Sequence, residues 1–181
     1  TGMDFAVRRF NAINRNKGII ISFDADCICD ENYLVEIESR FANNNKADCA
    51  ILYFEHPVKG DDFPSVIYSG IIQYELHLRY HIGFLRLIRY PYAYHTLGSC
   101  FAVKADAYIR QGGMNRRKAG EDFYFLQKIF SSGMTVEINQ TRICPSPRPS
   151  MRVPFGTGPI IHKMFSGNSP TLDTYNPQDS P

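Results

Sequence analysis

The sequence lacks several features that would place it in a specialised class of protein. No run of apolar residues reaches the ~18 to 20 positions that a membrane-spanning helix needs. An excess of one charge is missing too, because 20 Lys and Arg residues balance 18 Asp and Glu residues to a net charge of +2. A dedicated nucleic-acid binder usually has a strong basic bias, so we expect no nucleic-acid partner.

Cysteine is present, but its spacing does not indicate disulfides or a structural zinc site. The five cysteines are Cys27, Cys29, Cys49, Cys100 and Cys144. Their number is odd, and the closest pair is separated by one residue instead of the two that zinc ribbons use. Disulfides and structural zinc are therefore not expected. The pattern favours small, buried side chains in a reducing cytoplasm.

The beginning of the chain lacks an initiator methionine and the apolar core of a signal peptide. Its first residues, T-G-M-D-F, read as the interior of a structured domain. We therefore predict that the chain is a piece of a longer protein. Its 181 residues, 44% of them hydrophobic, are still enough to bury a sizeable core.

Helical and strand patterns alternate along the chain. Apolar spacing predicts helices over residues 4–16, 31–43, 105–111 and 121–131, and a longer helix over 64–90 that breaks at Gly83. Strands are predicted over 19–23, 47–54, 98–103 and 134–138. The run 19–23 is almost wholly apolar, as in strands buried on both faces of a parallel sheet. This order predicts an open α/β sheet, whose ligands bind beyond the carboxyl ends of the strands.

The predicted helix over residues 64–90 allows two interpretations. It combines apolar side chains with His77, Arg79, His81, Arg86 and Arg89. A basic, aromatic amphipathic helix can lie on an anionic membrane surface. A helix that packs against a core and turns a basic side to solvent has the same pattern, and this interpretation is favoured.

Two carboxylates follow the predicted strand 19–23. Asp24 and Asp26 are separated by one residue, and side chains in extended chain alternate with period two, so both are expected on one side. Paired oxygen ligands suit Mg²⁺ or Mn²⁺, with phosphate oxygens completing the coordination. Acidic residues are also common in turns after strands, so the D-x-D triplet by itself is weak evidence.

A second acidic pair, Glu121 and Asp122, opens the predicted helix 121–131 after a glycine-rich, basic loop. Either carboxylate could act as a general base on a hydroxyl nucleophile. Acidic residues also stabilise the first turn of a helix through its dipole. The two acidic pairs are far apart in the sequence, so only the fold can bring them together.

Arg148 and Arg152 form a third candidate group, in a segment rich in Pro, Gly and Ser. Guanidinium groups bind diphosphates well, and the G-T-G that follows could be a mobile loop. Arginines scattered in an exposed tail would give the same sequence. His162 is a weaker candidate, either as a metal ligand or as a surface histidine.

Together these segments resemble family-2 glycosyltransferases with the GT-A fold. The match consists of I-I-I-S-F-D-A-D at 19–26, the segments 98–104 and 112–115, and G-E-D-F-Y-F-L at 120–126, which has the family's G-E-D-x-x-x-L signature. The order and spacing agree over residues 1–138. The resemblance implies an α/β, Rossmann-like mixed sheet flanked by helices. It also implies an inverting, metal-dependent transfer of a sugar from a nucleotide diphosphate to a hydroxyl.

The resemblance also assigns roles to single residues. It implies that Asp24 and Asp26 lie around the ribose, the metal and the diphosphate, with Asp26 the more direct ligand. Asp122 matches the family's catalytic base, and Glu121 is its neighbour. We expect Mn²⁺ or Mg²⁺ as the cofactor, a nucleotide-sugar donor such as a UDP-sugar, and a saccharide or lipid-linked acceptor. The expected location is the cytoplasm, with peripheral contact at the inner face of the membrane.

The chain departs from the family's pattern in two ways. It has no tryptophan, so the Q-x-x-R-W motif of processive members is absent and polymer synthesis is not expected. The family's first β-α-β segment, which holds much of the nucleotide base, is also missing before the D-x-D strand. We therefore expect residues 1–145 to be a partial catalytic domain and 146–181 a C-terminal segment with a candidate active-site loop. The chain alone is expected to be inactive, and another copy could cover its truncated side.

Two alternatives to a transferase stay open. Haloacid-dehalogenase-type phosphatases also begin with an apolar strand and D-x-D, and there Asp24 would be the nucleophile. Their motif usually continues with Thr or Val where this chain has Ile28, and they need a further acidic pair at a strand end. The second alternative is a domain fragment without catalytic activity.

Overall fold

The structure is a computed structural model that describes residues 2–15, 17–114, 120–151 and 156–165. The chain divides into two compact units. The first comprises Thr1–Glu55 and Tyr94–Pro145, and the second comprises His56–Ala93 and Ser146–Pro181. The second unit thus combines an internal segment with the C-terminal part of the chain.

A mixed sheet forms the centre of the first unit. Within the described residues it has five strands: β1 (Ile19–Ser22), β2 (Ile28–Cys29), β3 (Ala47–Phe54), β4 (Phe101–Lys104) and β5 (Met134–Cys144). Their order is β1-β4-β3-β5-β2, and only β3 and β5 run parallel. The predicted strand 47–54 is confirmed as the central strand β3, most of whose side chains are buried.

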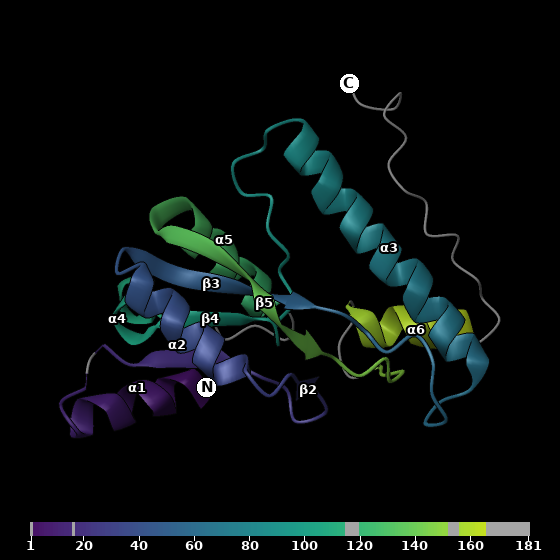
Figure 1. Cartoon of the computed structure of the whole chain (residues 1–181), viewed down its shortest axis with the longest axis horizontal. Helices are drawn as coiled ribbons and strands as arrows, with labels where there is room; N and C mark the ends of the chain where they lie inside the picture. The colour runs from purple at the N-terminus through teal and green to yellow at the C-terminus, as the bar shows by residue number, and fades with distance from the viewer. Residues whose placement is uncertain (1, 16, 115–119, 152–155, 166–181) are drawn as a thin grey trace. The chain divides into compact units, whose positions relative to one another are not determined.

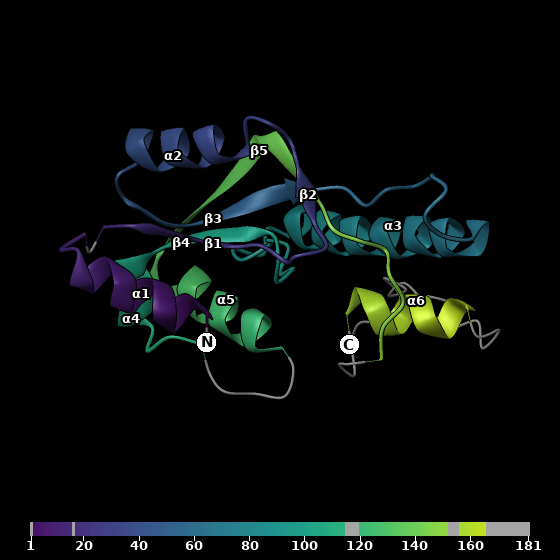
Figure 2. The same cartoon turned by 90° about the horizontal axis from the view of Figure 1, so that it is seen from below.

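Helices flank both faces of this sheet, as the α/β prediction requires. Figures 1 and 2 show α2 (Tyr33–Asn43) on one face. The other face is covered by α1 (Gly2–Ala12), α4 (Ala105–Arg110) and α5 (Glu121–Ser132). The buried side chains of β3 and β4 lie between these layers and form the core of the unit. The class of the fold, an α/β sheet flanked by helices, is confirmed.

The strand before the D-x-D pair is present as predicted, but its predicted position inside a parallel sheet is wrong. β1 was expected inside a parallel sheet, but it lies at the edge of the described sheet and pairs antiparallel with β4. Only Ile20 is buried in it. An apolar, β-branched run does not distinguish an internal strand from an edge strand that a helix covers. Here the ring of Phe10 in α1 packs at Gly18, next to β1.

Several details of the elements also differ from the predictions. The apolar spacing that predicts the helices 31–43 and 121–131 places Leu34 and Phe123 on their buried faces, but both side chains are exposed, and Phe125 is buried in α5 instead. Asp30 directly precedes the predicted helix 31–43, a position from which a carboxylate can cap a helix, but its carboxylate accepts a hydrogen bond from Arg142 at 3.2 Å instead. The short strand β2 was missed, because two residues are too few to show a periodic pattern.

In the second unit, α3 (Ser65–Leu87) packs against α6 (Thr157–Phe165). Ile67, Ile71 and Tyr74 of α3 form a buried cluster with Ile161 of α6. The predicted break at Gly83 is wrong, since α3 is continuous there. One glycine at an exposed helical position costs only about 1 kcal/mol relative to alanine, too little to interrupt a helix of this length.

The only acidic residue of α3 holds a buried network. Glu75 accepts hydrogen bonds from the backbone N of His56 at 2.7 Å and from Arg79 Nη2 at 2.7 Å. His56 Nδ1 lies 2.8 Å from the same carboxylate, and the histidine side chain is fully buried. Burial opposes ionisation of Glu75, but the bonds from His56 and Arg79 outweigh it and lower its pKa to about 2. The carboxylate therefore stays charged and ties the segment before α3 to the helix.

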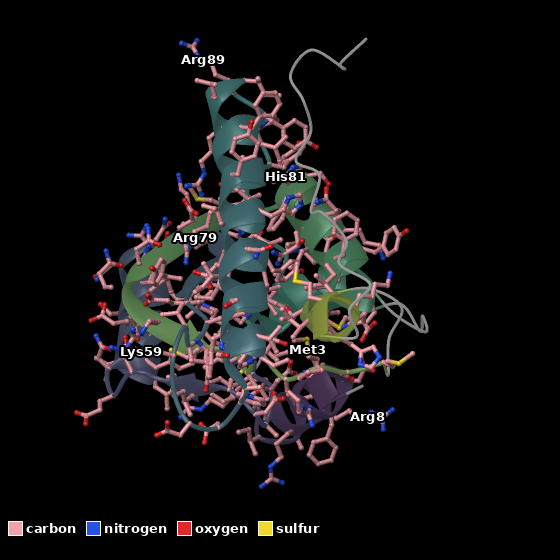
Figure 3. All side chains as sticks on the ribbon, turned by 90° about the vertical axis from the view of Figure 1, so that its right-hand side faces the viewer. Met3, Arg8, Lys59, Arg79, His81 and Arg89 are labelled. Atoms are coloured by element: carbon pink, nitrogen blue, oxygen red, sulfur yellow. The ribbon has the colours of Figure 1, made fainter. Side chains whose placement is uncertain are left out.

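A different face of α3 is apolar and exposed. Its large exposed side chains are those of Ile72, Leu76, Tyr80 and Leu87. Figure 3 shows Arg79 and His81 on opposite sides of this helix and Arg89 near its end. The predicted packing of this helix against a core is confirmed by its buried cluster with Ile161, whereas contact with a membrane surface stays a prediction. In the part of the chain that the structure describes, no helix is long and apolar enough to span a bilayer.

Candidate functional site

The D-x-D pair lies in a tight turn after β1. The backbone N of Cys27 donates a hydrogen bond to the carbonyl oxygen of Asp24 at 3.0 Å, which closes a four-residue turn. Asp24 and Asp26 are exposed, whereas Cys27 is buried. The two carboxylates are therefore brought together by the turn, and not by the alternation of an extended strand as predicted.

These side chains fit a divalent cation. One ligand atom from each of Asp24, Asp26 and Cys27 lies within 4.8 Å of the others. Carboxylate oxygens are the ligands that Mg²⁺ and Mn²⁺ prefer, and two of the three donors are carboxylates. Exposed acidic groups are also common without a metal. The donor set therefore permits a cation, and its chemistry supports Asp24 and Asp26 as ligands.

The second acidic pair is in the first turn of α5, as predicted. Gly120 precedes the helix with a backbone φ of 73°, a left-handed conformation that favours glycine. It directs the chain so that Glu121 and Asp122 begin the helix. Asp122 Oδ1 accepts a hydrogen bond from the backbone N of Phe123 at 2.8 Å.

The fold brings Asp122 close to the D-x-D turn. Burial raises the pKa of the Asp122 carboxyl, partly offset by the bond from Phe123. The charge of Glu121 and, to a smaller extent, that of Asp24 raise this pKa further. The start of α5 and the D-x-D turn therefore lie in the same region of the first unit.

A glycine creates the space that Asp122 occupies. A Cβ atom built onto Gly98 would collide with Oδ2 of Asp122. Gly98 lies just before Ser99 and Cys100, which are both buried beside the D-x-D turn. No sequence pattern indicates this close approach, since Gly98 was predicted only as the first residue of a strand.

We expect Gly98→Ala to displace the Asp122 carboxylate and to lower any reaction that depends on it by about 100-fold, as a shift of about 1 Å can do. Gly83→Ala is the matched control, because a Cβ atom there meets nothing within 4 Å and alanine favours a helix. The test compares the two variants by the initial rate of that reaction and by thermal melts. Equal rates for the two would show that the position of Asp122 is unimportant.

Buried thiols lie behind the D-x-D turn. The Ser99 hydroxyl lies 3.6 Å from Cys100 Sγ and also hydrogen-bonds the Cys27 thiol. Burial raises the pKa of Cys27, and it raises the pKa of Cys100 to about 12. Cys27 was predicted as a small buried side chain, which is confirmed, but its place beside the two carboxylates was missed. Its position directly after D-x-D was the only signal.

The remaining candidates lie outside this region of the first unit. Arg148 belongs to the second unit and is exposed. Arg152 lies outside the described residues. His162 is half-buried in α6 of the second unit. Their predicted roles at the diphosphate or the metal stay predictions.

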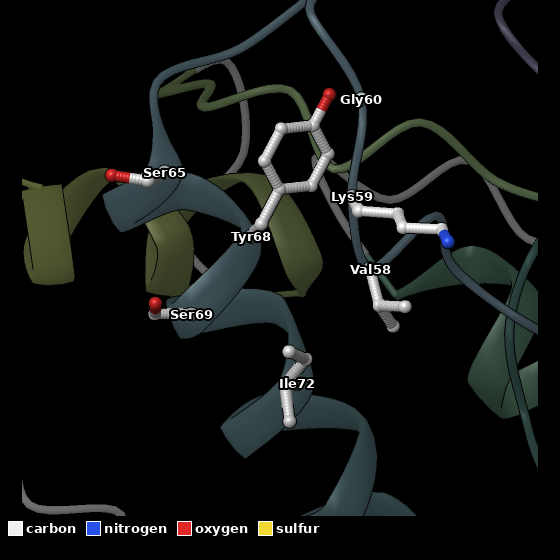
Figure 4. Close-up of a pocket in the computed structure, with 7 residues that line it drawn as sticks. All are labelled: Val58, Lys59, Gly60, Ser65, Tyr68, Ser69 and Ile72. Atoms are coloured by element: carbon white, nitrogen blue, oxygen red, sulfur yellow. The ribbon is translucent and has the colours of Figure 1, made fainter.

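The second unit has a shallow hollow of about 330 Å³ at the start of α3. Figure 4 shows that its polar side chains do not converge, because Lys59 points away from Ser65 and Ser69. Tyr68 instead points toward the backbone at Gly60. A ligand site normally needs a few convergent polar groups, so this hollow is a weaker candidate than the carboxylate region.

Comparison with known protein families and with curated proteins gave no match.

Proposed function

We propose that the chain is the catalytic part of a glycosyltransferase that moves a sugar from a nucleotide diphosphate to an acceptor hydroxyl, with inversion and with a divalent cation. The observation that carries this proposal is that one short segment touches both acidic pairs: Gly98 packs against the Asp122 carboxylate, and the next residue, Ser99, hydrogen-bonds Cys27 of the D-x-D turn. A cation site and a general base must be close neighbours in such a reaction, because both act on the bonds around one anomeric carbon.

Asp122 has the properties of the base. It is half-buried, its pKa is raised, and its position is fixed by Gly98 and the bond from Phe123. In the proposed reaction it takes the proton of the acceptor hydroxyl while the hydroxyl oxygen attacks the anomeric carbon. The bond from that carbon to the diphosphate breaks, and the nucleoside diphosphate leaves with the electron pair. Attack opposite to the leaving group inverts the anomeric configuration.

Asp24 and Asp26 have the properties of cation ligands. They would hold Mn²⁺ or Mg²⁺, which neutralises charge on a departing diphosphate when it is bound. Positive charge from Arg148 or Arg152 at the diphosphate stays a prediction. The fold supports the proposal at the level of class, since an α/β sheet flanked by helices suits the GT-A architecture.

Calorimetry with Mn²⁺ and a series of nucleoside diphosphate sugars tests this function. We expect donor binding that needs the cation, and transfer to a saccharide or lipid-linked acceptor in the protein that contains this chain. The anomeric configuration of the product, read by NMR, should be opposite to that of the donor. Donor binding that is equally strong with and without a divalent cation would contradict the proposal.

The phosphatase alternative requires a different role for Asp24. It needs Asp24 to form an acyl phosphate, which a fluoride analogue of the phosphoryl group would trap. Glu121 and Asp122 open the helix α5, whereas that alternative needs its further acidic pair at a strand end. The transferase therefore remains the better-supported function. Trapping of a fluoride analogue on Asp24 would reverse this order.

A further inference from the structure

We propose that the Cys27 thiol is a third ligand of the cation at Asp24 and Asp26, so that the site selects an ion that accepts sulfur over Mg²⁺. The inference rests on the proposed function for the location of the cation, but it makes a separate statement about which cation binds. Ligation by Cys27 can be tested without any measurement of sugar transfer.

The first argument is the geometry of the three donors. Ligand atoms of Asp24, Asp26 and Cys27 lie within 4.8 Å of one another. Donors at neighbouring corners of a tetrahedral ion lie about 3.3 to 3.7 Å apart, given typical metal–sulfur and metal–oxygen distances. The three ligand atoms therefore need to approach one another by at most about 1.5 Å to share an ion, which a change of rotamer in the exposed aspartates can supply. The hydrogen bond from Cys27 N to Asp24 O already fixes the backbone that carries them.

The second argument is a buried hydroxyl close to the thiols. The Tyr33 side chain is 3% exposed, and its hydroxyl has no hydrogen-bond partner among the described residues. The thiols of Cys100, Cys29 and Cys27 lie within its electrostatic range. A neutral thiol is a weak acceptor, whereas a metal-bound thiolate is a strong one. Cation binding at Cys27 would put such a thiolate in the same buried cluster as this unpaired hydroxyl, where metal sites usually have polar outer-shell groups.

The ligand set also decides which ions fit. Mg²⁺ takes oxygen ligands and keeps several waters, and it gains little from sulfur. Thiolate ligands favour softer ions, such as Zn²⁺ among the divalent metals, and the sequence Mn²⁺, Co²⁺, Zn²⁺ brings increasing affinity for mixed sites. Binding replaces the thiol proton by the metal, and that proton passes to solvent. The exposed carboxylates give the ion a route to the buried sulfur.

Cobalt(II) is the probe for the test. Thiolate bound to Co²⁺ gives an intense charge-transfer band in the near ultraviolet, which oxygen ligands do not give. We expect the 181-residue chain to develop this band on titration with Co²⁺, and Zn²⁺ to abolish it by displacement while equal Mg²⁺ does not. Cys27→Ser should lose the band, while Cys29→Ser and Cys100→Ser should keep it.

A band that survives in Cys27→Ser, or cobalt binding without a band in the unaltered chain, would overturn the inference. Absence of cobalt binding would overturn it as well. Thermal melts check that Cys27→Ser is folded. If it is not, Asp26→Asn serves instead, because the thiol remains and the band should still weaken through the loss of a shared ligand.

The same samples separate this inference from the proposed function. Cobalt binding without a band, together with cation-dependent binding of a nucleoside diphosphate, refutes the sulfur ligand and leaves the transferase intact. A band that depends on Cys27, together with no binding of a nucleoside diphosphate, supports the thiol site and refutes the transferase.

Discussion

Asp122→Asn is expected to lower the rate of sugar transfer by about 10²- to 10⁴-fold, the usual contribution of a general base. The amide keeps an oxygen that can accept the bond from Phe123, so the start of α5 should not change. Donor binding should stay intact, because the proposed cation ligands are Asp24 and Asp26. Initial rates and calorimetric donor titrations on the protein that contains this chain make the test.

Asp106→Asn is the matched control for this variant. Asp106 also begins a helix, and its Oδ1 accepts a hydrogen bond from the next backbone N at 2.8 Å, as Asp122 Oδ1 does. It lies in α4, where it pairs with Arg110. We expect an unchanged rate in this variant. Full activity in Asp122→Asn would refute the assignment of the base.

The pH dependence gives a second test of Asp122. A base works only when ionised, so the rate should fall as pH falls through the raised pKa of this carboxyl. The folded state also carries a penalty for the ionised form above that pKa, and the penalty disappears below the unfolded value of about 3.9. Asp122→Asn should therefore raise the Tm at neutral pH, and the gain should shrink as the solution is acidified.

Asp26→Ala is expected to abolish cation-dependent donor binding. Loss of one ligand from a set of three leaves a weaker site, and the departing diphosphate loses its neutralising charge. The matched control is Asp62→Ala, which removes an exposed carboxylate from the second unit. Calorimetry with Mn²⁺ and the donor should show no heat for Asp26→Ala and normal binding for the control. Normal binding in both variants would place the cation elsewhere.

Much of the fold could be predicted from local patterns. The strand 47–54 and the helix that begins at Glu121 are in the structure at the predicted positions, because a long apolar run and an acidic first turn are strong signals. Pairing was harder to predict, as the edge position of β1 demonstrates. The pairing of a strand depends on contacts throughout the sheet, whereas the residues of the strand itself indicate mainly how much of it is buried.

The candidate site could also be predicted only in part. Types and order of residues pointed to Asp24, Asp26, Glu121 and Asp122, but the turn that joins the first pair and the approach of Asp122 to Gly98 depend on contacts between distant segments. The composition of residues 146–181 hid the helix α6, whose Ile161 is buried against side chains of α3.

The central claim is that one cation-binding centre joins the D-x-D turn to the start of α5. It can be tested most directly by the amide NMR spectrum of the chain during titration with Mn²⁺, which accelerates the relaxation of nearby nuclei. We predict early loss of the signals of the turn Asp24–Cys27 together with those of Asp122 and Phe123, and no such loss in Asp24→Asn/Asp26→Asn. Loss confined to the turn, or centred on another part of the chain, would contradict the account.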